Sequence, residues 1–308
     1  MARAVAASTA VAVIGGLLLV GPSDAAVSNP CTMRVTLDRV SSVTYANGVE
    51  RQKYNVKVSW GADRSQSAEV HRMIMPAQAV PRLVTKDLGT LGQLRSQLES
   101  PKGKRGIAAV NGDFFYGYRI DGQTVYLPRN ASVKNGKPIR LGPVRTRVVG
   151  IDKNGVPFDE QVGVKGTVSH GSKVYKVDSL NWHVIGDGAV AIFTPAWADT
   201  STANRPAGAV EWVVKKGKIL DVRTGTQTGK TVNPHTMVVA FGKNFAREAR
   251  RANPGSDASI DVKQSAPGGV QLREAIGRGV ALVDGGQVAL PCEPRWYPQR
   301  PRTTVGWD

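Results

Sequence analysis

The sequence predicts an α+β protein: a single domain built on a mixed, strand-rich β-sheet, with a few short helices. Glycine (34 residues) and proline (18) are plentiful while aromatic residues make up only 6% of the chain, which favours strands joined by many turns. Several short stretches alternate apolar and polar residues, the period of a half-buried strand. No repeat of fixed period and no clear linker divides the sequence, so one domain is the simplest interpretation.

The individual elements follow from local patterns. Two alternating stretches flank Asn47-Gly48, which predicts a hairpin. Further strands are expected at residues 68–75, 106–110, 180–193, 210–222 and 236–241, with a short hairpin at 279–290. Short helices are expected at residues 90–99 and 244–251, the first because its leucines are spaced three and four apart. Other turns are expected at Asn135-Gly136, Asn154-Gly155, Lys216-Gly217 and Asp284-Gly285-Gly286.

The N-terminus has the features of a cleavable signal peptide over residues 1–25. Arg3 precedes an apolar run at 11–20, and small residues at Ser23 and Ala25 suit a signal peptidase. The alternative is a retained anchor, but a bilayer span needs about 20 apolar residues and this run is half as long. We therefore expect a secreted, extracellular protein, with a β-rich segment at 26–64 and the main domain at 65–308.

The net charge limits the classes of binding partner that we expect, and the cysteine content bears on disulfides and metal sites. The formal net charge is +17, from 41 Lys and Arg against 24 Asp and Glu. Because the chain is exported and its cations are scattered, we expect association with phosphorylated glycans or an anionic cell envelope and not with nucleic acid. A merely soluble basic surface is the alternative. Cys31 and Cys292 are expected to form a disulfide in an oxidising compartment, and no metal site or other cofactor is expected.

Two familiar catalytic patterns are absent from the sequence. The glycines at 225 and 229 imitate a phosphate-binding loop, but their spacing is wrong and no helix follows them. No G-x-S-x-G segment supports a serine hydrolase. Among the four histidines, His183 in the Asn181-Trp182-His183 segment is the one that we follow into the structure.

Two other segments could carry chemistry. In Asn111-Gly112-Asp113-Phe114-Phe115, a carboxylate projects from a turn at the end of an apolar strand, where catalytic groups are common. An ordinary turn is the alternative. Near the C-terminus Arg302 follows a proline that holds the backbone extended, so it could bind a phosphate through two parallel hydrogen bonds. The alternative there is a basic, proline-rich tail.

Together these segments resemble the phosphodiester glycosidase family, which includes the uncovering enzyme that removes N-acetylglucosamine from mannose 6-phosphate diesters. The family's NGDFF segment is matched at residues 111–115, and its P-R-T-A-V-G segment at 301–306, with Thr304 in place of Ala. The resemblance covers about residues 65–308. The family continues through later D-G-R and D-G-G-G-S segments that this sequence lacks, so the chain resembles a member truncated at its C-terminus.

The resemblance implies a secreted hydrolase of glycosyl-1-phosphodiester bonds. We expect Asn111, Asp113 and Arg302 to converge as catalytic residues: Arg302 neutralises the phosphate leaving group, Asp113 positions or activates water, and Asn111 binds substrate. The residues expected to contact substrate are Gly112, Phe114, Thr303 and Asp308. In its truncated form the chain is expected to have little or no activity. The alternative is a non-catalytic extracellular or cell-envelope module that binds anionic glycans.

Overall fold

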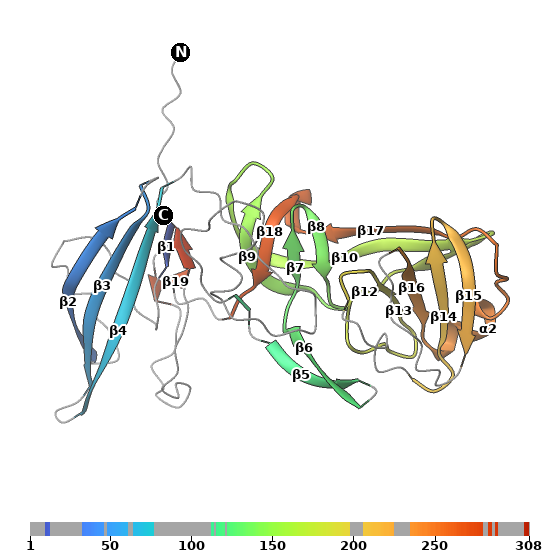
Figure 1. Ribbon diagram of the computed structural model, residues 1–308, viewed down its shortest axis with the longest axis horizontal. Helices are drawn as coiled ribbons and strands as arrows, with labels where there is room; N and C mark the ends of the chain where they lie inside the picture. The colour runs from blue at the N-terminus through green and yellow to red at the C-terminus, as the bar shows by residue number, and fades with distance from the viewer. Residues whose placement is uncertain are drawn as a thin grey trace, which may run out of the picture. The chain divides into compact units, whose positions relative to one another are not determined.

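The computed structural model describes residues 10–12, 33–45, 48–60, 64–76, 112–113, 115–120, 122–197, 206–224, 235–279, 283–284, 287–288 and 305–307 (Figure 1). The chain divides into two compact units. The first comprises Met1–Val80, Lys104–Asn111 and Val280–Asp308, and the second comprises Pro81–Gly103 and Gly112–Gly279. The prediction of a strand-rich, mixed β fold is confirmed, but two compact units with several separate sheets replace the single domain and single sheet that the sequence predicted.

The first unit contains a five-stranded sheet in the order β2-β3-β4-β1-β21. Its strands are β1 (Ala10–Ala12), β2 (Met33–Thr44), β3 (Glu50–Trp60), β4 (Arg64–Met75) and β21 (Val305–Trp307). The predicted hairpin is confirmed: Gly48 has a φ of 75°, and β2 pairs antiparallel with β3. Val56 and Val70 are buried on one face of this sheet. The short pair β19 (Val283–Asp284) and β20 (Gln287–Val288) confirms the centre of the later hairpin.

The second unit contains a seven-stranded sheet, a five-stranded sheet and a two-stranded ribbon. The first sheet consists of β7 (Ser132–Lys134), β8 (Lys137–Arg140), β9 (Thr146–Asp152), β10 (Pro157–His170), β11 (Lys173–Lys176), β17 (Ser259–Ser265) and β18 (Leu272–Gly277). The second consists of β12 (Ser179–Leu180), β13 (Val190–Phe193), β14 (Val210–Lys215), β15 (Lys218–Thr224) and β16 (Met237–Phe241). The ribbon pairs β5 (Phe115–Ile120) with β6 (Gln123–Pro128). The helical elements described are α2 (Lys243–Ala249) and a 3-10 turn at Pro267–Gly269.

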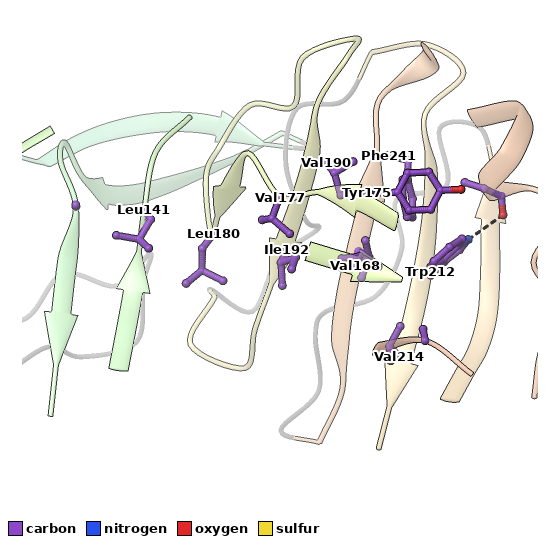
Figure 2. Close-up of a cluster of buried hydrophobic side chains, with 14 of the residues drawn as sticks. Leu141, Val168, Tyr175, Val177, Leu180, Val190, Ile192, Trp212, Val214 and Phe241 are labelled. Atoms are coloured by element: carbon purple, nitrogen blue, oxygen red, sulfur yellow. Dashed lines mark hydrogen bonds between the residues drawn. The ribbon is translucent and has the colours of Figure 1, made fainter. Parts of the chain in front are cut away.

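The main core of the second unit is built from both sheets and α2 (Figure 2). Tyr175, Trp212 and Phe241 form an aromatic cluster with ring centroids 4.4–6.1 Å apart. The Trp212 indole Nε1 donates a hydrogen bond of 2.8 Å to the Ala249 carbonyl at the end of α2. The polar edge of the buried ring is therefore satisfied, while each large apolar side chain buried here contributes about 1.5–3 kcal/mol.

Turn predictions in this unit are confirmed, because the required backbone angles are present. Asn135 and Gly136 between β7 and β8 have φ values of 50° and 76°, and Lys216 and Gly217 between β14 and β15 have values of 48° and 73°. Two successive residues of positive φ match the right-handed twist of the strands that they join. The short helix predicted at 244–251 is also confirmed, as α2.

The prediction of one strand over residues 180–193 is wrong. The chain forms β12 and β13, which pair in parallel and are separated by a loop. Parallel neighbours cannot be joined by a tight turn, and Asn181, with a φ of 50°, turns the chain out of β12 at once. This loop carries His183, so the incorrectly predicted segment is the one that matters for the site.

Some predictions fall outside the described residues. These are the helix at 90–99, the strand at 106–110, the Cys31–Cys292 disulfide and all but three residues of the signal peptide. They stay predictions. In the part of the chain that is described, none of the helices has the length and apolar character needed to span a bilayer.

Candidate functional site

Asp113 is held at the base of the β5–β6 ribbon. It precedes β5 and Asn130 follows β6, and the pairing of these strands brings the two residues together. The backbone N–H of Asn130 donates to Asp113 Oδ2 at 2.6 Å, and the Asn130 side-chain Nδ2 donates to Oδ1 at 3.0 Å. Both carboxylate oxygens are therefore engaged, and the orientation of the group is fixed.

Two glycines make room for this arrangement. Gly277 ends β18 directly beside it, and a Cβ there would overlap both the Asn130 side chain and the Asp113 carboxylate. A Cβ on Gly112 would lie 3.0 Å from Ile276 Cδ1. Close packing against Ile276 therefore explains why a glycine stands at position 112. The predicted contact of Gly112 with substrate stays a prediction.

The second component is Arg140, at the end of β8, which is fully buried. Its Nη1 donates to the Asn181 carbonyl at 2.6 Å, its Nη2 donates to His183 Nδ1 at 3.1 Å, and its Cζ lies 4.0 Å from the centroid of the Trp182 ring. Burial lowers the pKa of Arg140 to about 10, against the opposing attraction of Tyr118 and Asp113. Arg140 remains a cation at neutral pH.

The loop after β12 is shaped to meet Arg140. Asn181 adopts the left-handed conformation that asparagine tolerates, and its side-chain Nδ2 donates to the Ile139 carbonyl (2.6 Å) and to Thr194 Oγ1 (2.9 Å). Trp182 packs on Gly142, where a Cβ would come within 3.0 Å of the indole ring. These contacts direct the Asn181 carbonyl and the next two side chains toward the guanidinium.

Arg140 fixes the tautomer of His183. A guanidinium only donates hydrogen bonds, so His183 Nδ1 must accept, and the proton of the neutral ring is on Nε2. Burial and then the charge of Arg140 lower the pKa of His183 to about 4. The ring also stacks on Tyr118, with centroids 3.7 Å apart. At neutral pH His183 is therefore an oriented, uncharged donor.

These groups form one polar centre within the second unit. Asn130, which holds Asp113, lies two residues before Ser132, the cross-strand partner of Arg140, so the carboxylate and the guanidinium are attached to the same hairpin. The charge of Asp113 also raises the pKa of Arg140, against the larger effect of burial. A fixed carboxylate can activate water, and an oriented N–H donor can stabilise negative charge that develops in a transition state. Arg140 is buried beneath His183 and acts through it, so we regard Arg140 as a positioning residue.

The structure tests the predicted site only in part. Asp113 and Gly112 are described, but Asn111, Phe114, Arg302, Thr303 and Asp308 lie outside the described residues, so the predicted convergence with Arg302 stays a prediction. The sequence reasoning singled out His183 but missed its partner Arg140, and it missed Asn130. An isolated arginine at a strand end gives no signal of burial, and Asn130 could be found only by pairing the two ends of a hairpin that was not predicted.

No protein-family model matches this chain, and no curated protein matches it in sequence. Among solved structures, the chain is similar to a "Putative exported protein" from Burkholderia pseudomallei K96243, with a TM-score of 0.60 and 13% identity over 82% of this chain and 74% of that chain. A hypothetical protein from Synechocystis has a TM-score of 0.48 and 13% identity, over 87% of this chain and 64% of that chain. At this identity, the first likeness shows a shared fold.

Proposed function

We propose that this protein is a secreted hydrolase of glycosyl-1-phosphodiesters, with Asp113 and His183 as its catalytic residues. The single observation that supports this most is the combination of a fixed carboxylate with a neutral histidine whose Nε2–H is oriented by a buried arginine. The resemblance of residues 111–115 to the phosphodiester glycosidase family supports the same reaction.

The reaction needs two functions. A water molecule must attack the anomeric carbon, and Asp113 supplies a carboxylate that can orient or deprotonate it. The bond that breaks joins the anomeric carbon to a phosphate oxygen, and the phosphate leaves as an anion. His183 donates its Nε2–H to that oxygen, and Arg302 remains the predicted group for the rest of the phosphate charge.

An extracellular location is part of the proposal. It is supported by the predicted signal peptide and by the printed name of the Burkholderia protein. The net charge of +17 would attract the protein to anionic glycans at a cell surface. The same charge favours the second candidate function, a module that binds such glycans without cleaving them.

The test is turnover of a sugar-1-phosphate diester that carries a chromogenic alcohol, by protein expressed from its own gene. An added phosphatase releases the alcohol from the phosphate monoester that cleavage at the anomeric carbon produces. Asp113→Asn and His183→Gln should each lower kcat by about 10²–10⁴-fold. The matched controls are Asp221→Asn, an exposed aspartate in β15, and His170→Gln, which lies at the end of β10. Urea unfolding confirms that each variant is folded. Equal turnover in the site variants and the controls would contradict the proposal, and binding without turnover would favour the module.

A further inference from the structure

We propose that Tyr116 and Arg129 form a binding subsite for a sugar ring that carries a phosphate, beside the Asp113–His183 centre. This inference rests on the proposed function for the identity of the ligand, and it adds two residues that bind that ligand. It begins from an exposed aromatic side chain. Tyr116 is 47% exposed although two side chains already contact its ring.

One face of β5 leads from the core to this subsite. Side chains alternate along a strand, so Tyr116, Tyr118 and Ile120 share a face. Ile120 is fully buried, Tyr118 stacks on His183, and Tyr116 contacts Tyr118 in a T-shaped arrangement with centroids 6.2 Å apart. The aromatic surface thus runs continuously from His183 to solvent and ends at the Tyr116 ring.

A cation accompanies the exposed ring. The guanidinium carbon of Arg129 lies 5.8 Å from the centroid of the Tyr116 ring, and the Arg129 side chain is exposed. Arg129 directly precedes Asn130, which holds Asp113. The same short segment therefore fixes the carboxylate and places a positive charge beside the ring.

This pair suits one class of ligand. The C–H faces of a pyranose ring pack on aromatic rings, as apolar surface does generally. A guanidinium matches phosphate through two parallel hydrogen bonds. A sugar 1-phosphate unit presents both features within one ring and its substituent. The pair is linked to the centre by Tyr118, which contacts Tyr116 and stacks on His183, and by Asn130, which follows Arg129 and holds Asp113.

The opposite face of the ribbon provides matched controls. Phe115 and Arg119 point away from the Tyr116 face, by strand alternation, and both are exposed. Phe115 contacts Tyr126 with centroids 5.9 Å apart. A general loss of exposed aromatic or positive surface would affect these residues as much as Tyr116 and Arg129.

The experiment measures binding by calorimetry on the secreted protein, with the 1-phosphates of glucose, galactose, mannose and N-acetylglucosamine, and with the methyl glycosides of the same sugars. At least one 1-phosphate should bind saturably. Tyr116→Ala should weaken its binding about tenfold, and Arg129→Gln should weaken the 1-phosphate about tenfold while leaving the methyl glycoside unaffected. Phe115→Ala and Arg119→Gln should bind as the wild type does.

Two outcomes overturn the inference: none of the four 1-phosphates binds, or the Tyr116 and Arg129 variants bind as their controls do. Turnover of the chromogenic diester is measured on the same samples. Normal turnover with unchanged affinities would leave the proposed function standing and remove the subsite. Binding that depends on Tyr116 and Arg129, without turnover, would support the subsite and contradict the hydrolase.

Discussion

The charged side chains of the β2–β4 sheet and those of the site in the second unit have opposite environments: the first are exposed and paired with opposite charges, and Arg140 in the second is buried among neutral partners. On the open sheet, Lys53 Nζ lies 2.5 Å from Glu69 Oε2 and His71 Nε2 lies 2.6 Å from Glu69 Oε1, with all three side chains substantially exposed. In the site, Arg140 is fully buried and its hydrogen-bond partners are a carbonyl and an imidazole.

The pKa shifts express this difference. Hydrogen bonds from Lys53 and then His71 lower the pKa of Glu69, so its neighbours favour the charged form. Burial lowers the pKa of Arg140, so its surroundings disfavour the charged form. Arg140 stays charged although burial disfavours its charged form, which indicates a role that a surface charge does not have. The four predictions below test this contrast between buried and exposed charges.

The largest effect is expected on removing Arg140. Arg140→Met keeps an unbranched side chain but leaves the Asn181 carbonyl and His183 Nδ1 without their donor. An unsatisfied buried acceptor costs about 1–3 kcal/mol, so the free energy of unfolding should fall by about 2–5 kcal/mol. Urea unfolding measures this. Arg140→Lys, which keeps a charge and a donor, should lose less free energy of unfolding. A loss below about 1 kcal/mol in Arg140→Met would contradict the proposed difference between buried and exposed charges.

A smaller effect is expected at Gly277. Gly277→Ala places a methyl group against Asn130 and the Asp113 carboxylate, and overpacking of this kind costs about 1–3 kcal/mol. It should also lower turnover, because Asp113 must move. The control is Gly186→Ala, where the nearest atom to a new Cβ is 3.8 Å away. Equal stability and turnover in the two variants would show that the Asp113 site accommodates an added methyl group without loss.

These positions also show what the sequence could and could not predict. The turn at Asn135-Gly136 depends on two adjacent residues of types that accept positive φ, so it could be predicted from the sequence. β10 was missed because Gly163 and Gly166 interrupt its pattern, although Gly166 is required where the Asp261 carbonyl of β17 approaches. The burial of Arg140 depends on partners some forty residues later, one of them a backbone carbonyl, and such a contact leaves no pattern in the sequence.

The third prediction concerns the titration of His183. Its pKa of about 4 lies below the usual 6.5, so the native state binds fewer protons than the unfolded chain between these values. The contribution of His183 to stability is therefore present above about pH 6.5 and is lost as the pH falls toward 4. NMR of the ring Cε1–H should follow a midpoint near 4 in the wild type, rising in Arg140→Met because one of its two causes is removed. A wild-type midpoint near the ordinary value would contradict the buried interaction.

The smallest effect is expected on the open sheet, from Lys53→Gln, Glu69→Gln and the double variant. Both side chains are already solvated, and water and salt replace what each loses. A double-mutant cycle in urea should give a coupling energy within error at moderate salt. The lowered pKa of Glu69 predicts stabilisation above the carboxyl's usual range that is lost as the pH falls through it, so a residual coupling should appear only above that range and at low salt. A coupling that resists salt and approaches the loss in Arg140→Met would show that exposed and buried charges are equivalent in this protein, and would remove the argument that burial singles out Arg140.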